Sequence, residues 1–524
     1  MGGALDVLPN DVEELKRTVS SQQQTLESQQ KHISILEEEI RFLKDKLFGR
    51  KADRWSAEEL RQGRLFNEAE QGAGQQPTET EQQVSSIPVA SHTRQPRGRR
   101  ALPANLPREE VVHDIPEEQK VCACGASLSR IGEETSEKLK IIPPKLIVVR
   151  HIRPKYACRS CQGVETEGGA VKIAEPPAQL IPKGIATPEL LAYLLTSKFV
   201  DALPFYRQEK MLARIGVDLS RATMCNWAIQ VAQRLQPLLE LLRDQIRAGP
   251  YVQIDETTLQ VLDEPGREAE SKSYMWVYRG GESEKPSLIY QYFPSRSGDV
   301  PFEFLDGYEG YVQTDGYAGY DKLGREPGIL MLGCWAHVRR KFVDVTKVSA
   351  GGSNAHDMLE LIRRLYEVEH AAKQGEFAPR QIAELRMQKA LPILTKIEGQ
   401  LQSLKDQTPP QGLLGKATGY ALGQWERLTR YVENGILRPD NNLAENAIRP
   451  FVVGRKNWLF AATPAGAYAS AALFSVVETA KANGHEPYWY LRFLLSRLAT
   501  ASTTEDYRAL LPQNVRPDEL IRTV

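Results

Sequence analysis

The hydrophobic positions at the start of the chain follow a seven-residue repeat. From residue 8 to residue 47, apolar side chains recur at alternating spacings of three and four, which predicts a coiled coil over residues 8–50. One heptad position holds Val12, Val19, Leu26, Ile33, Ile40 and Leu47, and the other holds Leu8, Leu15, Leu36 and Leu43. Gln22 and Gln29 interrupt the second series, and buried polar side chains at such positions fix register or oligomer state. We therefore expect self-association through this helix.

The next segment has no hydrophobic period. Residues 67–92 are rich in Gln, Glu and Ser with few large apolar side chains, a composition typical of a flexible linker. A basic cluster follows, made of Arg94, Arg97, Arg99 and Arg100. This cluster either ends the linker as a solubilising segment or forms an arm that binds phosphate groups. Residues 67–110 are therefore predicted to form a flexible basic linker.

Four cysteines form two close pairs on either side of a strand-rich segment. They are Cys122 and Cys124, then Cys158 and Cys161. Tetrahedral zinc prefers four soft ligands, so the pairs predict a structural Zn²⁺ site in a small β module over residues 111–170. The first pair is one residue tighter than the spacing of the second, so two free pairs, or a site with His151 as a ligand, stay open. Basic residues around the second pair make this module a candidate for binding DNA ends.

Residues 177–248 have the pattern of helices. Within them the stretch GVDLSRATMCNWAIQVAQRL contains a glycine, a capping residue at Ser220 and a following helix. This arrangement resembles the second half of a helix-turn-helix. We predict a helical DNA-binding region here.

From Tyr251 the pattern changes to strands mixed with helices. Runs of β-branched and aromatic residues predict strands at 251–262, 273–279, 287–293, 310–315 and 329–333. A short helix near 297–306 separates the third strand from the fourth, and the helix-forming sequence CWAHVRRKFVDV follows the fifth. A mainly helical stretch then runs to about residue 436, another helix begins near Asn441, and the last 70 residues are mostly helical.

Two of the predicted strands begin almost identically, as YVQIDETTLQ from Tyr251 and YVQTDGYAGY from Tyr311. In each, the Tyr, Gln and Asp side chains share one face, because side chains alternate along a strand. Neighbouring strands lie ~4.8 Å apart, so Asp255 and Asp315 at matching depth could bracket one or two cations. The alternative is that each Asp ends a strand and caps a turn, which suits Asp315 because Gly316 follows it.

A third carboxylate comes from the segment NNLAENAIRPFVVGRKNWLF. Glu445 lies early in a helix that Asn441 or Asn442 can cap. Behind it the segment carries Asn446, Arg449, Arg455, Lys456 and Trp458. An acid for metal, bases for phosphate and an indole for stacking are the groups that phosphoryl transfer on a nucleic acid uses. A solvated helix face explains Glu445 alone, but not the residues behind it.

The composition argues against a membrane-spanning, a secreted and a disulfide-rich protein. The chain has 524 residues with 67 basic and 67 acidic side chains, so any basic surface must be local. No apolar run approaches the ~18 residues of a membrane span, and the N-terminus lacks the features of a secretory signal. Six cysteines are too few for a disulfide scaffold in a chain of this length. We expect a cytoplasmic protein without a membrane partner.

Five blocks occur in order along the chain: QIDETTLQV, QTDGYAGY, CWAHVRRKF, NNLAENAIRPFVVGRKNWLFA and AKANGHEPYWYL. In this order they resemble the transposases of the insertion-sequence 66 family, which belong to the Asp-Asp-Glu group with a ribonuclease-H-like core. The resemblance covers nearly the whole chain and implies a multidomain α/β protein. After the coiled coil, zinc-binding-like module and helical region, it implies a catalytic core at 249–480 with a helical insertion at 350–436, and a helical C-terminal element at 481–524.

The resemblance also implies the chemistry. Asp255, Asp315 and Glu445 would be the catalytic residues and would hold Mg²⁺ or Mn²⁺. One ion would activate water or a DNA 3′-hydroxyl, and the other would stabilise the leaving 3′-oxygen during in-line attack on phosphorus. The implied partners are double-stranded DNA, as transposon ends and as target, and helper proteins of the same element.

The block CWAHVRRKF permits two interpretations. Cys334 and His337 lie one helical turn apart, but this pair alone lacks the four ligands that a zinc site needs. We place His337 near the scissile phosphate and Arg339 and Arg340 on the DNA backbone; a packed cysteine and a satisfied helix histidine are the alternative. The residues expected on DNA are His337, Arg339, Arg340, Arg449, Arg455, Lys456 and Trp458.

Two other functions stay open at this point. The first is a DNA-binding and assembly protein with an inert core, and the second is a repair or recombination nuclease built on the same core. Intact acids at Asp255, Asp315 and Glu445 argue against the inert core.

Overall fold

The computed structural model describes residues 12–48, 146–157, 171–348 and 354–520. The chain divides into two units, Met1–Gln75 with Ala178–Val524, and Gln76–Pro177. In the second unit the described residues contain one antiparallel pair of strands, β1 (Lys155–Ala157) and β2 (Val171–Ile173). The four predicted zinc ligands and the basic linker lie outside the described residues.

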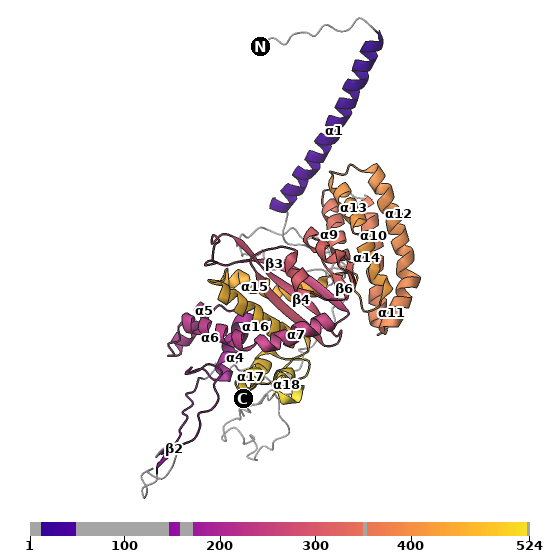
Figure 1. Ribbon diagram of the computed structural model, residues 1–524. Coiled ribbons are helices and arrows are strands. Elements are labelled where there is room, and N and C mark those ends of the chain that lie inside the picture. Colours follow the sequence, from indigo (N-terminus) through magenta and orange to yellow (C-terminus); the bar gives the residue numbers. More distant parts are fainter. Residues whose placement is uncertain (1–11, 49–145, 158–170, 349–353, 521–524) are drawn as a thin grey trace, which may run out of the picture. The chain divides into compact units, whose positions relative to one another are not determined.

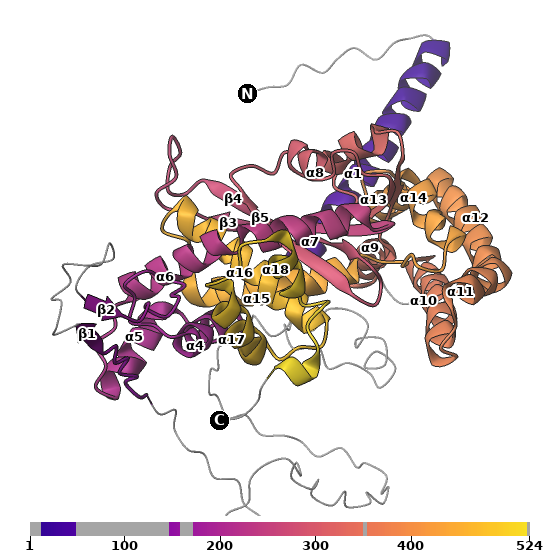
Figure 2. The same ribbon diagram turned by 60° about the horizontal axis from the view of Figure 1, so that its bottom comes forward.

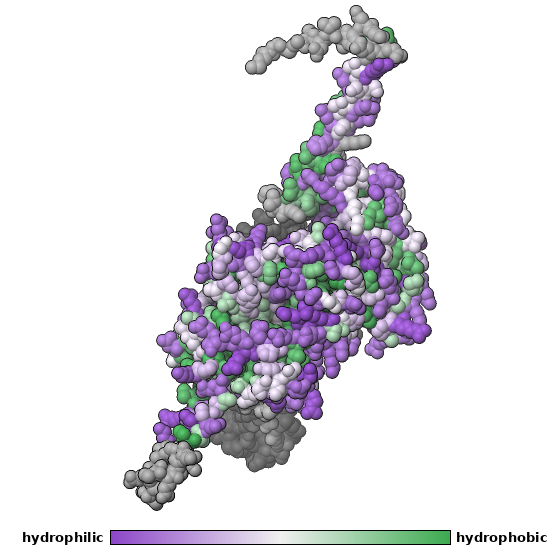
Figure 3. Space-filling model, viewed as in Figure 1, coloured by the Kyte–Doolittle hydropathy of each residue, from purple (hydrophilic) through white to green (hydrophobic). Residues whose placement is uncertain are grey.

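The predicted coiled-coil segment forms one long helix, α1 (Val12–Phe48). Seven of its heptad residues are exposed large hydrophobics: Val12, Val19, Leu26, Ile33, Leu36, Ile40 and Leu43. In Figure 3 hydrophobic residues accordingly interrupt the hydrophilic surface of this helix. An apolar stripe exposed along a helix is the feature that a second helix would cover.

A five-stranded sheet forms the centre of the larger unit, and it confirms the five predicted strands. They are β3 (Tyr251–Gln260), β4 (Lys272–Gly281), β5 (Pro286–Phe293), β6 (Gly310–Gln313) and β7 (Ile329–Leu332). Their spatial order is β5-β4-β3-β6-β7. The first three strands in sequence pair antiparallel, whereas β6 and β7 run parallel to β3. The predicted short helix between β5 and β6 is α8 (Asp299–Phe304).

Helices cover both faces of this sheet (Figures 1 and 2). One face carries α15 (Asn442–Trp458) and α16 (Pro464–Ala482), and the other carries α7 (Gln236–Ala248), α8 and the 3₁₀ helix η2 (Ala318–Arg325). On the first face Tyr290 of β5 donates a hydrogen bond to the carbonyl of Ala447. On the second, Tyr278 of β4 stacks on Phe304 with ring centroids 3.6 Å apart. A sheet covered on both faces explains why consecutive residues of β4 (275–278) and β5 (287–290) are all buried.

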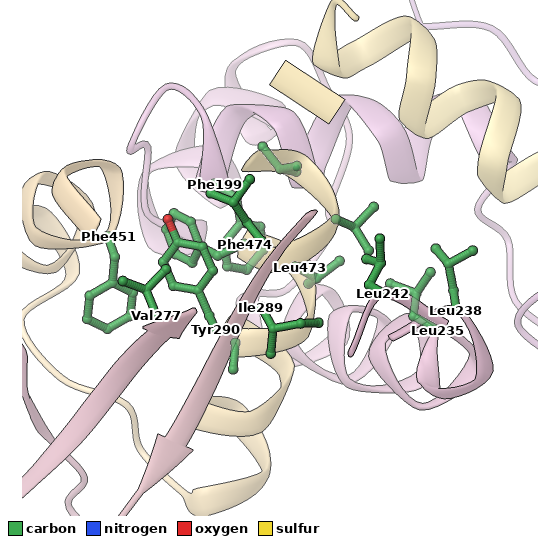
Figure 4. Close-up of a cluster of buried hydrophobic side chains, with 14 of the residues drawn as sticks. Phe199, Leu235, Leu238, Leu242, Val277, Ile289, Tyr290, Phe451, Leu473 and Phe474 are labelled. Carbon is green, nitrogen blue, oxygen red and sulfur yellow. The ribbon is translucent and has the colours of Figure 1, made fainter. Parts of the chain in front are cut away.

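The helical region before the sheet shares its core with the sheet (Figure 4). This region contains α4 (Pro188–Phe199), α5 (Phe205–Arg214), α6 (Arg221–Arg234) and α7. Phe199 of α4 packs edge-on against Phe474 of α16, with ring centroids 5.3 Å apart. The side chain of Ser220 accepts a hydrogen bond from the amide of Thr223, which confirms the predicted helix cap.

At the edge strand β5, backbone groups form hydrogen bonds with a helix rather than with another strand. In α16 the Ser475 hydroxyl accepts a hydrogen bond from the amide of Tyr290, and the Thr479 hydroxyl accepts one from the amide of Leu288. These two polar side chains are fully buried because they hydrogen-bond the backbone of the strand edge that α16 covers. Two further helices, α17 (Pro487–Leu498) and α18 (Thr504–Ala509), and the 3₁₀ turn η5 (Pro517–Glu519) complete the unit.

A second hydrophobic core lies in the helices between β7 and α15. They are α9 (Trp335–Thr346), α10 (Asn354–Gln374), α11 (Pro379–Leu385), η3 (Arg386–Ala390), α12 (Leu391–Gln407), α13 (Leu413–Gly423), α14 (Trp425–Thr429) and η4 (Arg430–Glu433). The buried Arg386 side chain pairs with Glu369 and donates to the carbonyls of Tyr431, Asn434 and Leu437. These bonds hold the chain that leads into α15.

In the described parts of the chain, we find no helix with both the length and the apolar character to cross a membrane.

Candidate active site

The two repeated segments lie side by side and in register. Tyr251 pairs with Tyr311, Val252 with Val312 and Gln253 with Gln313 in the parallel ladder between β3 and β6. Asp255 and Asp315 therefore each stand two residues beyond the last pair. The sequence prediction that the two strands are neighbours is confirmed.

The repeated glutamines have a role that the sequence analysis missed. Gln253 and Gln313 are both buried, and the Gln253 amide donates 2.8 Å to the side-chain oxygen of Gln313. Gln253 also donates to the carbonyl of Asp440, and Gln313 donates to the carbonyls of Gly333 and Arg438. The pair therefore joins the two strands to the chain that enters α15. Buried amides at equivalent positions of a repeat are a signal of such pairing.

Asp255 lies where β3 meets the start of α15. Its carboxylate accepts a hydrogen bond of 2.9 Å from the amide of Glu256. The pKa of Asp255 is raised well above its usual value, first because the surrounding protein removes water and then because Glu256, Glu445 and Asp315 add negative charge. Asp255 is thus within electrostatic reach of both other predicted catalytic acids.

The start of α15 differs in detail from the sequence prediction. Asn441 occupies the N-cap position, but its side chain makes no capping bond and instead donates 2.8 Å to the carbonyl of Ile254. Asp440 accepts from the amide of Asn442 at 3.1 Å. Asn441 is fully buried against β3, so its side chain bonds to the carbonyl of the strand instead of capping the helix. This contact fixes the first turn of α15, which carries Glu445, next to Asp255.

Asp315 lies two residues after the end of β6, and its negative charge acts on Asp255. Its carboxylate accepts a hydrogen bond of 2.8 Å from the amide of Tyr317, as the turn-capping alternative expects. Its backbone carbonyl accepts one of 2.6 Å from the hydroxyl of Tyr420 in α13. Gly316 has φ +83°, and a Cβ there would lie 2.9 Å from that hydroxyl, so this turn needs glycine. A helix about one hundred residues away in sequence therefore touches the backbone of Asp315.

His337 and Arg340 of α9 face Glu445. The His337 Nδ1 and an Arg340 guanidinium nitrogen each lie 3.6 Å from a Glu445 carboxylate oxygen. The pKa of His337 is lowered to about 4, mainly by burial and then by Arg340, while Asp315 opposes the shift. His337 is therefore neutral at neutral pH.

Glu256 is a fourth acid that the sequence analysis did not select. Its side chain is only 2% exposed, and it pairs with Arg296 at 2.6 Å and accepts a hydrogen bond from Tyr320. Burial raises the pKa of Glu256, whereas the hydrogen bonds from Tyr320 and Arg296 lower it. A charged residue that follows Val252 and Ile254 on one face of β3 is the signal that could have predicted a buried acid with a cationic partner.

Comparison with known proteins identifies the family. Residues 183–469, more than half of the chain, match the family model described as "Transposase IS66 family". The chain belongs to the IS66 transposase family. Three further models of this family match: a "zinc-finger binding domain of transposase IS66" at 119–162, an "IS66 C-terminal element" at 475–513 and a "Transposase C of IS166 homeodomain" at 35–111.

The chain is also similar to individual bacterial proteins. The proteins y4jD and y4qI of Sinorhizobium fredii (strain NBRC 101917 / NGR234), both described as uncharacterized, are each 34% identical to this chain. The matches cover 83% and 87% of this chain, and 88% and 84% of those proteins. The uncharacterized y4hP of the same organism is 28% identical over 80% of this chain and 78% of its own length. No solved structure matches the chain.

The transposase family and its zinc-finger model imply DNA as a partner and zinc as a ligand. The residues expected on DNA differ in their surroundings. Arg340 and Lys456 are exposed, and Arg339 and Arg449 are half-buried. Arg455 donates 3.1 Å to the hydroxyl of Thr257 on β3. Trp458 packs edge-on against Phe451, and the Lys198 ammonium lies 5.3 Å from its ring.

Proposed function

We propose that this chain is an active DNA transposase that cleaves the ends of its insertion sequence and joins them to target DNA by metal-dependent, in-line phosphoryl transfer. One observation carries the proposal: β3 and β6 pair in register, so Asp255 and Asp315 each stand two residues beyond the last pair of this ladder. Glu445 comes from α15, which packs on the sheet face that Asp255 shares.

The order of elements supports a ribonuclease-H-like core. Three antiparallel strands, a short helix, and two strands parallel to β3 are the arrangement that the proposed core requires. The helices of residues 354–433 would then be the insertion that precedes the catalytic Glu. We propose the same domain limits that the sequence predicts.

The three acids fit a hard divalent cation. Carboxylate oxygens are the ligands that Mg²⁺ and Mn²⁺ prefer, and nearby negative charges raise the pKa of Asp255. A cation beside Asp255, Asp315 and Glu445 would relieve this repulsion. The bound ions would activate the attacking hydroxyl or water and neutralise charge at phosphorus.

The other side chains of the site would bind and orient DNA. His337 is neutral and next to Glu445, so its ring can hydrogen-bond a phosphate oxygen without adding charge. Arg340 is exposed at the same edge and can exchange its contact with Glu445 for a DNA phosphate. Arg339, Arg449 and Lys456 would add backbone contacts. Arg455 and Trp458 would bind DNA as the sequence predicts. They would also hold α15 in place through their contacts with Thr257 and Phe451.

Assembly would use the other regions. The exposed apolar stripe of α1 would pair protomers, and the zinc-finger segment, with Cys122, Cys124, Cys158 and Cys161, would bind the DNA ends. Helper proteins of the same element would join this complex.

The test is incubation of the full-length chain with DNA that carries the inverted ends flanking its coding region. The proposal expects cleavage at these ends and joined products with Mg²⁺ and none without a divalent ion. An inert core predicts binding without cleavage. A repair nuclease predicts cleavage of DNA that lacks the ends.

A further inference from the structure

Three potential metal ligands of different chemistry meet beside the proposed magnesium site. The Cys334 sulfur, a His337 ring nitrogen and a Glu445 carboxylate oxygen all lie within 4.8 Å of one another. We propose that these residues form an inhibitory Zn²⁺ site, separate from the zinc finger, which removes Glu445 from the catalytic magnesium. Its inhibitory effect rests on the proposed function, but zinc binding does not.

The backbone brings the three ligands together. Cys334 directly precedes α9 and His337 lies one turn into it, while Glu445 lies in the first turn of α15. The sulfur of Cys334 accepts a hydrogen bond of 3.2 Å from the amide of Asn441, the N-cap residue of α15. The two helix starts are thus joined at the site itself. In sequence Cys334 and His337 form a pair with too few ligands, and the fold supplies the third.

The distances are close to those that zinc needs. The His337 Nδ1 lies 3.6 Å from the Glu445 Oε1. Two ligands at ~2.0–2.1 Å from a tetrahedral zinc ion are about 3.3–3.4 Å apart. The Nδ1 is buried and makes no hydrogen bond among the described residues. A small approach of the side chains would therefore place a cation between them.

The ligand set favours zinc over magnesium. Sulfur and imidazole are ligands that Mg²⁺ rarely accepts, whereas Zn²⁺ binds thiolate, imidazole and carboxylate together. Three protein ligands leave the fourth position of zinc to water. Binding replaces the thiol proton of Cys334, which leaves to solvent. The proposed magnesium site, by contrast, consists of carboxylate oxygens only.

The ion has a route to the site. Cys334 is 1% exposed, but the side chains of His337 and Glu445 are 21% and 16% exposed. Zinc would therefore enter from the side that faces DNA. Zinc bound to Cys334 and His337 would draw the Glu445 carboxylate away from Asp255 and Asp315, so zinc binding would compete with cleavage.

Cobalt absorption tests the site without any need for activity. Co²⁺ replaces Zn²⁺ and gives a strong near-ultraviolet band for each sulfur that binds it. In titrations of the full-length protein, Cys334→Ser and His337→Gln should each bind one equivalent fewer than the matched control Cys225→Ser, which changes an exposed free cysteine. The zinc-finger cysteines contribute equally to all three proteins. Identical titrations of Cys334→Ser, His337→Gln and the control would overturn the proposal.

Inhibition gives the second readout. Cleavage at fixed Mg²⁺ is measured with rising Zn²⁺, and each variant is compared with its own zinc-free rate. The half-inhibiting Zn²⁺ concentration should rise at least about tenfold in Cys334→Ser relative to Cys225→Ser. Equal sensitivity would refute the inhibitory site. A chain that binds Co²⁺ through Cys334 but never cleaves DNA would support this site and refute the proposed function instead.

Discussion

The amide of Gln253 on β3 donates a hydrogen bond of 2.8 Å to the side-chain oxygen of Gln313 on β6. The bond joins the two strands two residues before Asp255 and Asp315. A slip of one residue between the strands would break it and turn one aspartate to the opposite face of the sheet. The glutamine pair therefore helps to set the register on which the proposed site depends.

Loss of this pair should destabilise the core. Gln313→Leu leaves the buried carbonyls of Gly333 and Arg438 without these donors and deprives Gln253 of an acceptor. We expect the free energy of unfolding to fall by about 1–3 kcal/mol. Denaturant unfolding of the full chain measures this, with Gln260→Leu, an exposed glutamine of β3, as the control. Equal stability of the two variants would show that the buried pair contributes nothing.

The raised pKa of Asp255 predicts a pH dependence of stability. The folded-state pKa of Asp255 lies above the value in the unfolded chain. The folded protein is therefore destabilised as pH rises from about 3.9 toward the folded pKa, because the unfolded chain loses this proton more readily. Without added divalent ion, Asp255→Asn should raise the midpoint of thermal unfolding at pH 7. The increase should be smaller at pH 5. Added Mg²⁺ should stabilise the wild type more than the variant. A variant less stable than wild type at every pH would contradict the electrostatic account.

The contact between Tyr420 and Asp315 predicts that the inserted helices affect metal binding and cleavage at the proposed site. Tyr420→Phe keeps the ring and removes only the hydrogen bond to the Asp315 carbonyl. Cleavage should fall by up to about tenfold, with a higher Mg²⁺ requirement and unchanged DNA-end binding, since one such bond contributes about 0.5–1.5 kcal/mol. Tyr507→Phe removes a similar bond to Ala501 in the C-terminal region and is the control. If both variants require the same Mg²⁺ concentration, the hydrogen bond from Tyr420 does not contribute to metal binding at the site.

The exposed stripe of α1 predicts where protomers pair. Ile33, Leu36 and Ile40 are 55%, 44% and 50% exposed, so their replacement by Asp does not disturb a core within the chain. In a coiled coil the same charges would be buried and unpaired, which is costly. Light scattering should show loss of self-association, and a gel assay with two labelled DNA ends should show loss of paired complexes.

The matched control for α1 places Asp on the other side of the helix, at Ser21, Gln24 and Ser28. This variant should behave as wild type. If the stripe variant still pairs DNA ends, the assembly interface lies elsewhere in the chain.

Local patterns predicted the sheet well because most of its strands are rich in β-branched and aromatic residues. The repeated segment even predicted which strands are neighbours, and the pairing of Tyr251 with Tyr311 confirms it. Contacts between distant segments were not predictable in this way. Nothing local in α13 indicates that Tyr420 reaches Asp315, and the Asn441 side chain leaves its capping position only because β3 offers a carbonyl. The burial of Glu256 was not predictable locally either, because its partners Arg296 and Tyr320 lie 40 and 64 residues away in sequence.

The most direct test of the central claim is the rate of Mg²⁺-dependent cleavage at cognate DNA ends by three isosteric variants. Asp255→Asn, Asp315→Asn and Glu445→Gln each remove one proposed metal ligand with little change in shape. The control Asp299→Asn changes an acid whose side chain is 59% exposed and paired with Lys322. We predict that the three variants bind ends but do not cleave them, while Asp299→Asn cleaves like the wild type. Cleavage near the wild-type rate by any of the three would contradict it.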